Sequence, residues 1–202
     1  WILKESCAQC VRWNEAGLET IPVAVNVSSI QFKRGNMVQR TKEILEQTGL
    51  SGGLLELELT ESLLFEDSDN LLDSLVELGG VGVQFSIDDF GTGYSSLSYL
   101  DKLPLNKVKI DRSFVRDIVD DEQKLKLLRG IIHMSRELGL EIVTEGVETN
   151  EQLAVIRDND CADIIQGFIF GMPMPKSAIR ELSRKLDRSK GATASQLQKQ
   201  TK

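Results

Sequence analysis

Strand-like apolar runs alternate with amphipathic helical runs along most of the chain, and this alternation restricts the fold more than any other feature. Six runs have the length and the valine, isoleucine or leucine content of strands: 22–27, 54–60, 81–87, 107–111, 141–146 and 163–168. Helical runs such as 36–48 and 121–138 lie between them, and each ends at a glycine, as helices often do. Because strand–helix–strand repeats form parallel sheets, we expect an α/β protein.

Polar side chains recur at every second position of these strands. Leucines alternate with Glu56 and Glu58 in the second run, and valines alternate with Ala24, Asn26 and Ser28 in the first. Alternate residues of a strand face opposite sides of the sheet. Crossover helices must cover the apolar face, so the polar face is expected to line an interior, as in a barrel of the TIM (β/α)8 type.

Each predicted strand ends in residues that can bind a ligand. In chain order they are Asn26, Glu58, Asp88 with Asp89, Lys109 with Asp111, Glu145 and Gln166. Barrel enzymes assemble their chemistry at the carboxyl ends of several strands. Adjacent carboxylates there repel each other and need a cation, and hard oxygen donors favour Mg²⁺ or Mn²⁺ over zinc. We therefore expect a divalent metal site at these strand ends.

The composition argues against several other classes of protein. The net charge of −7 disfavours binding to a nucleic acid polymer or to an anionic membrane. No apolar run approaches the roughly 20 residues of a membrane span, and no secretion signal is evident. We expect a cytoplasmic chain, either free or as the cytoplasmic part of a membrane-anchored protein. Cys7 and Cys10 lack a second cysteine pair or a nearby histidine, which favours packing over metal or redox chemistry.

Six motifs follow one another along the chain. They are Asn26-Val27-Ser28, Glu58-Leu59-Thr60-Glu61-Ser62, Asp88-Asp89-Phe90-Gly91-Thr92-Gly93-Tyr94-Ser95-Ser96, Lys109-Ile110-Asp111, Glu145-Gly146-Val147-Glu148 and Gln166-Gly167-Phe168. In order and in spacing, they resemble the motifs of the EAL family. Members of that family are bacterial phosphodiesterases that open cyclic di-GMP to linear pGpG at a two-metal site on a modified TIM barrel. The resemblance assigns residues 1–182 to the barrel and leaves 183–202 as a polar, disordered tail.

The resemblance also implies a role for each strand end. Two Mg²⁺ or Mn²⁺ ions would be bound by Asn26, Glu58, Asp88, Asp89 and Glu145, with Asp88 bridging both. Lys109 would orient the attacking hydroxide or neutralise developing charge.

Other residues would support these ligands or contact the substrate. Glu61 would hold the loop that follows Asp89 in shape. The remaining supporting residues, which would lie behind the metal ligands or reach the metals through water, are Asp111, Glu148 and Gln166. The residues expected at the substrate are Gly91, Phe168 and Phe170.

Each of these roles has a structural alternative. Asp88 and Asp89 could cap a helix or a turn, and Glu145 could be a plain helix-start acid. Lys109 could simply pair with Asp111 or with an acid on a neighbouring strand. Glu56 lies one pleat deeper than Glu58, so an ion pair inside the barrel is favoured over a metal role.

The Glu-Ala-Leu motif that names the family is absent. Residues 15–18, Glu-Ala-Gly-Leu, lie at the end of the first helical run and do not replace it. A family barrel has two more strands before this point, so we expect these strands and the missing glutamate to lie upstream.

Three functions remain open: an active phosphodiesterase, a cyclic di-GMP receptor or protein-interaction module without catalysis, and a fragment that is inactive, poorly soluble or domain-swapped alone. A homodimer and upstream sensory or cyclase domains are expected from the resemblance.

Overall fold

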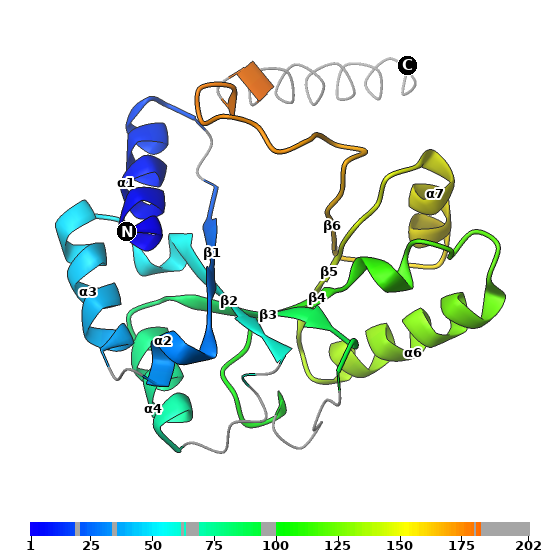
Figure 1. Cartoon of the computed structure of the whole chain (residues 1–202), viewed down its shortest axis with the longest axis horizontal. Helices are drawn as coiled ribbons and strands as arrows, with labels where there is room; N and C mark the ends of the chain where they lie inside the picture. Colours follow the sequence, from blue (N-terminus) through cyan, green and yellow to red (C-terminus); the bar gives the residue numbers. More distant parts are fainter. Residues whose placement is uncertain are drawn as a thin grey trace, which may run out of the picture.

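The computed structural model describes residues 1–18, 21–33, 36–61, 63, 69–93, 100–179 and 181–182. Six parallel strands form one curved sheet in chain order (Figure 1). They are β1 (Val23–Val27), β2 (Leu55–Thr60), β3 (Gln84–Phe90), β4 (Lys107–Ile110), β5 (Glu141–Thr144) and β6 (Ile164–Ile165). The predicted α/β class, strand number and parallel order are confirmed.

Two strands differ from the prediction by three residues or more at an end. The strand expected from residue 81 begins at Gln84, because Val81 and Val83 donate their N–H groups to the Leu78 carbonyl in a turn. That turn passes through Gly82 in the left-handed region, at φ 93°. The same strand continues through Asp89, so the acidic pair lies within β3 rather than after it. The strand expected over 163–168 is only two residues long.

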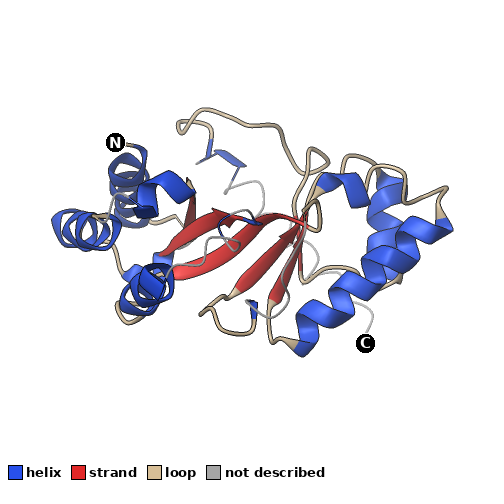
Figure 2. Cartoon of the chain, turned by 60° about the horizontal axis from the view of Figure 1, so that its bottom comes forward, coloured by secondary structure: helices blue, strands red, loops and turns tan. Residues whose placement is uncertain are grey.

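Helices lie on the convex side of the sheet, outside the ring of strands (Figures 1 and 2). They are α1 (Ile2–Glu15), α2 (Ser29–Lys33), α3 (Met37–Thr48), α4 (Asp69–Gly79), α6 (Glu122–Glu137) and α7 (Asn150–Asp158), with the 3-10 turns η1 (Gly52–Leu54) and η3 (Arg112–Phe114). As predicted, α3 ends at Gly49, which is left-handed at φ 71°. None of the helices in the described ranges combines the length and hydropathy required to cross a membrane.

The two faces of the sheet have opposite character, as the alternation predicts. Leu55, Leu57 and Leu59 are fully buried on the helix side, where they join one apolar core with side chains of α3, α4 and α6. Glu56 and Glu58 occupy the alternate positions and are also buried. Burial of acids on the inner face means that they must be paired or must bind a cation.

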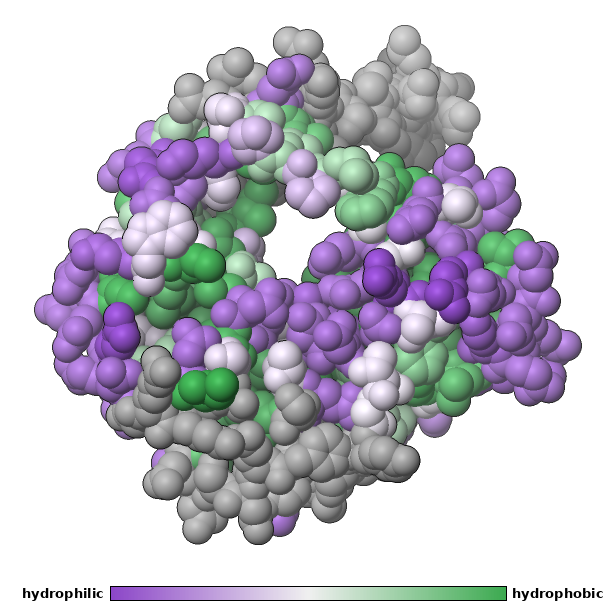
Figure 3. Space-filling view, viewed as in Figure 1, coloured by the Kyte–Doolittle hydropathy of each residue, from purple (hydrophilic) through white to green (hydrophobic). Residues whose placement is uncertain are grey.

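The ring of strands is not closed by strand pairing. Within the described ranges, β1 pairs only with β2, and β6 pairs only with β5. The segment after β6 crosses from β6 to α1, where Lys176 Nζ lies 3.3 Å from Glu5 Oε1 (Figure 1). Hydrophilic side chains gather on the strands beside a central opening (Figure 3). The predicted tail over 183–202 lies outside the described residues.

Candidate functional site

A single buried ammonium group joins the ends of several strands. Lys109 of β4 donates a hydrogen bond from Nζ to Asp88 Oδ1 of β3 at 2.8 Å. The same Nζ forms ion pairs with Glu58 Oε1 of β2 at 2.9 Å and with Glu145 Oε1, just after β5, at 2.7 Å. The Lys109 side chain is only 8% exposed. Four segments far apart in the sequence therefore meet at one charge.

The charge on Lys109 is secured by its neighbours. Burial alone would lower the pKa of Lys109, but its contacts with Asp88, Glu145 and Glu58 outweigh burial and raise the pKa. The lysine is therefore an ammonium ion at any physiological pH. Burial raises the pKa of Glu145, and the proximity of Lys109 opposes that rise. Lys109 pairs with acids of neighbouring strands, as one structural alternative proposed. Among the described residues, its ion pairs are with Glu58, Asp88 and Glu145 and not with Asp111.

A bulge in β3 turns both acids of the pair toward the site. Ile87 pairs with Val108 and Phe90 with Ile110, so β3 carries one residue more than β4 over this stretch. Asp89 takes up the extra length in the left-handed region, at φ 56°. Carboxylate oxygens of Asp88, Asp89 and Glu145 all lie within 4.8 Å of one another. Simple alternation would have sent Asp89 to the opposite face.

The residues at this position fit a divalent metal. Four carboxylates (Glu58, Asp88, Asp89 and Glu145) lie around the single ammonium of Lys109, which leaves excess negative charge. Burial, then the charges of Asp88 and Asp111, raise the pKa of Asp89. Oε1 of Glu145 is buried and, despite the 2.7 Å ion pair, has no hydrogen bond of suitable geometry from the described residues. Hard oxygen donors with surplus charge suit Mg²⁺ or Mn²⁺.

Asn26 lies beside this cluster on the neighbouring strand. It pairs in register with Glu58, and both occupy the inner face of the sheet. Asn26 is exposed, whereas Glu58 is buried. The predicted amide ligand is thus adjacent to a predicted carboxylate ligand.

Glu61 organises the backbone that follows the acidic pair. Its Oε2 accepts the N–H groups of Gly91 and Gly93, both at 3.2 Å. Gly91 is left-handed at φ 91°, and a Cβ there would lie 2.8 Å from the Phe114 ring. Glycine is therefore required at the start of this loop. The predicted motif residues Ser62, Tyr94, Ser95 and Ser96 lie outside the described residues.

The remaining predicted residues lie around the site at greater exposure. Asp111 accepts the Ser113 N–H at 3.0 Å and caps η3. Burial alone would raise the pKa of Asp111, but the hydrogen bonds from Ser113 outweigh burial and lower this pKa. Glu148 lines a pocket with Asp111. Gln166 is exposed and follows β6. Its backbone N–H donates to the Thr144 carbonyl, and its carbonyl accepts the N–H of Val147. Phe168 and Phe170 are 52% and 53% exposed on the crossing segment.

A second layer of ion pairs lies one pleat below the acids that surround Lys109. Lys107 Nζ contacts Glu56 Oε2 at 2.7 Å and Glu141 Oε2 at 3.5 Å. The interior ion pair predicted for Glu56 is confirmed. Lys107 itself was not expected there, although its spacing of two from Lys109 places it on the inner face.

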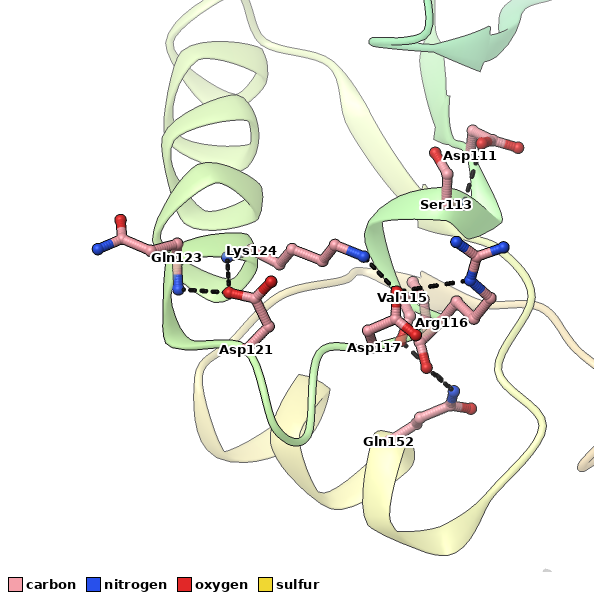
Figure 4. Close-up of polar contacts among 9 residues, drawn as sticks. All are labelled: Asp111, Ser113, Val115, Arg116, Asp117, Asp121, Gln123, Lys124 and Gln152. Carbon is pink, nitrogen blue, oxygen red and sulfur yellow. Dashed lines mark hydrogen bonds and ion pairs between the residues drawn. The ribbon is translucent and has the colours of Figure 1, made fainter.

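Gln152 is a further residue that the sequence analysis did not single out. Its Oε1 accepts the N–H groups of Glu148 and Thr149, and its Nε2 donates to the carbonyls of Val115 and Arg116 (Figure 4). The buried amide thus joins the segment after β5 to the segment after β4. The sequence feature that could have identified Gln152 is the spacing Thr149-x-x-Gln152, which is typical of a capping box at the start of a helix. The structure contains this capping box.

Comparison with known proteins gives consistent matches over most of the chain. Residues 1–173 match the family model described as the EAL domain. The cyclic di-GMP phosphodiesterase NbdA of Pseudomonas aeruginosa is 42% identical over 184 residues, which cover 91% of this chain and 23% of that protein. The chain thus spans about a quarter of the length of such curated relatives.

Solved structures match the fold as well. The phosphodiesterase MucR of the same bacterium, in complex with c-di-GMP, is 40% identical with a TM-score of 0.83, over 89% of this chain and 72% of that one. A manganese and cy-diGMP complex of BlrP1 from Klebsiella pneumoniae is 28% identical with a TM-score of 0.76, over 86% of this chain and 43% of that one.

Proposed function

The chain belongs to the EAL domain family, and we propose that its site hydrolyses cyclic di-GMP to linear pGpG with the help of divalent metal ions. The observation that carries this proposal is the cluster of Glu58, Asp88, Asp89 and Glu145 around Lys109 at one end of the sheet. An ion-pair network built only for stability would need no such excess of carboxylates over cations.

The carboxylates divide into two sets of metal ligands. Asp88, Asp89 and Glu145 would hold one ion, since their oxygens lie within 4.8 Å of one another. Glu58 and its register partner Asn26 would hold the other, with Asp88 shared. Bound Mg²⁺ or Mn²⁺ supplies Lewis acidity, which activates water and stabilises negative charge on phosphoryl oxygens.

Lys109 contributes charge rather than acid–base chemistry. Its contacts with Asp88, Glu145 and Glu58 raise its pKa, so Lys109 is an ammonium ion among these acids. A fixed ammonium among the metal-binding acids instead attracts the phosphodiester and stabilises the charge that develops on it. Water would add to phosphorus and give up a proton while the P–O3′ bond breaks, and the departing O3′ would take up a proton. The products of this step are the 5′-phosphate and the free 3′-hydroxyl of pGpG.

Glu61 and the glycines after Asp89 would position one set of ligands. The two hydrogen bonds from Gly91 and Gly93 tie the loop to the end of β2. Because this loop starts one residue after the β3 bulge, its shape fixes how Asp89 approaches the metal. Such supporting contacts commonly change metal affinity by about 10- to 100-fold.

Conversion of cyclic di-GMP to pGpG with Mg²⁺ or Mn²⁺ tests the proposal in the native-length protein. Asp88→Asn and Glu145→Gln should each lower kcat/KM by at least about 100-fold, because each removes a charged metal ligand. Glu46→Gln is a matched control, since Glu46 is exposed on α3, away from the strands. Nucleotide binding without cleavage under either metal would instead support the receptor alternative.

A further inference from the structure

A hydrophilic pocket of about 470 Å³ lies just beyond the metal-binding acids. Its lining residues are Asp111, Arg112, Ser113, Arg116, Gly146, Glu148 and Gln152. Asp111 directly follows β4, which carries Lys109, and Gly146 directly follows Glu145. Two residues that line the pocket are therefore close in the chain to two residues of the proposed metal site, Lys109 and Glu145.

Arg112 is the basic residue in this pocket that is available to a ligand. Lys109 and Lys107 are already surrounded by acids, and Arg116 Nε lies 3.5 Å from Asp117 Oδ2. Among the residues that the structure describes, none forms a hydrogen bond or ion pair with the exposed guanidinium of Arg112.

The position of Arg112 is fixed by close packing. A Cβ built on Gly146 would lie 2.2 Å from the Cβ of Arg112, so glycine lets the two backbones approach. Gly146 is also left-handed, at φ 70°. The amide of Gln152 then ties the chain after Arg112 to the start of α7, as Figure 4 shows for the carbonyl of Val115. The stem of Arg112 is thus held beside Glu145.

We infer that Arg112 binds the second phosphate of cyclic di-GMP while the first lies at the metals; this inference rests on the proposed function. A cyclic dinucleotide carries two phosphodiester anions, and the metal site can engage only one for cleavage. The other anion would meet an acidic surface on a chain of net charge −7. A guanidinium offers two parallel N–H donors to phosphate oxygens, which makes it suited to this contact.

Steady-state kinetics of the native-length protein test this assignment. Arg112→Met should raise KM for cyclic di-GMP by about 10- to 100-fold, the range for losing a charged hydrogen-bond partner, with kcat changed less than about threefold. Arg129→Met is the matched control, because it removes an exposed arginine from the outer helix α6. An unchanged KM in Arg112→Met would overturn the inference.

Two further measurements separate phosphate binding from other roles of Arg112. Arg112→Lys keeps the charge but not the two parallel N–H donors, so its KM should lie between that of the wild type and that of Arg112→Met. A KM equal to that of Arg112→Met would mean that the positive charge contributes nothing, and it would overturn the assignment to a phosphate. The Mn²⁺ concentration for half-maximal activity should not change in Arg112→Met. A shift in that concentration with an unchanged KM would mean that Arg112 acts only on the metal-binding acids.

Failure of the inference can be told apart from failure of the proposed function. If the wild type cleaves cyclic di-GMP and Arg112→Met has the same KM, only the inference is wrong. If the wild type does not cleave it, the proposed function is wrong, and calorimetric binding of cyclic di-GMP to wild type and Arg112→Met still decides whether Arg112 contacts the ligand.

Discussion

Lys109 holds the candidate site together before any metal binds. Its ammonium contacts Glu58, Asp88 and Glu145 at 2.7 to 2.9 Å, so three carboxylates that would otherwise repel one another stay at one place. Each of these acids is mostly buried, and water cannot fully compensate for their charges. The lysine therefore acts on stability as well as on any reaction at this site.

Replacing Lys109 with methionine should destabilise the protein in metal-free buffer. Removing one partner of a buried ion pair costs about 3–5 kcal/mol, because the remaining charge stays buried. Mn²⁺ should restore part of that loss, since it can take over the freed carboxylates. Thermal unfolding with and without Mn²⁺ measures both effects. Lys126→Met, which removes an exposed lysine paired with Glu122 on α6, should change little. Equal stability of Lys109→Met and wild type without Mn²⁺ would contradict the role given to Lys109.

At the scale of elements, the alternation of polar and apolar residues predicts most of the site. It does not predict that Asp89 faces the site. The inner-face positions of β2 and β4 follow from a period of two, which placed Glu58 and Lys109 correctly. The bulge at Asp89 could not be read in this way, because adding one residue reverses the face of whatever follows. Aspartate tolerates the left-handed backbone that the bulge needs better than most residues, but that preference is too weak to predict a bulge.

The start of β3 and the pocket around Arg112 were also not predicted from the alternation of residues. Val81 and Val83 have the alternation of a strand, yet the turn at Gly82 removes both from the sheet. The pocket around Arg112 could not be found from sequence, because it depends on the contact between Gly146 and a residue 34 positions earlier. In the local sequence, the only feature that reflects such a long-range contact is the glycine itself.

Substitution of Gly91 by alanine should disturb the loop after the acidic pair. A Cβ at φ 91° is strained, and it would lie 2.8 Å from the Phe114 ring. Strain of this kind costs about 1–3 kcal/mol, and the Glu61 contacts to Gly91 and Gly93 should weaken with it. The free energy of unfolding, measured with denaturant, and kcat/KM should both fall.

Gly130→Ala provides the comparison for that change. Gly130 lies inside α6, and a Cβ there would meet nothing within 4 Å. The same chemical change should therefore stabilise the protein by about 0.5–1 kcal/mol, because alanine favours a helix over glycine. Similar effects of the two substitutions on stability would rule out strain at Gly91.

On the scale of the whole molecule, the apolar core lies outside the ring of strands. The helices α1, α3, α4 and α6 pack against the outer face, and the buried residues of all of them join one cluster. Cys7 and Cys10 are part of this cluster at the α1 end, and Cys161 is part of it near β6. Free thiols at separate places in one core can report whether the core opens as a unit.

Alkylation of Cys7 should therefore follow global unfolding. Burial raises the pKa of Cys7 to about 11. At pH 8 only about a thousandth of the thiol is then the reactive thiolate. Labelling by iodoacetamide should be slow in buffer and should accelerate across the unfolding transition in urea. Mass spectrometry of the labelled peptides measures this, and full labelling in urea is the control. Rapid labelling of native Cys7 at pH 8 would contradict its burial.

The opposite faces of β2 have a consequence for how the sequence of this protein can change during evolution. Leu55, Leu57 and Leu59 pack against the helices, while Glu56 and Glu58 serve the interior. The outer-face positions can therefore hold the helices in place whichever residues the inner-face positions carry. The proposed metal ligands Glu58, Asp88 and Glu145 could change together with their shared partner Lys109 while the barrel wall stays intact. Loss of catalysis need not be visible in the fold, and only the inner-face residues distinguish an enzyme from a relative that merely binds.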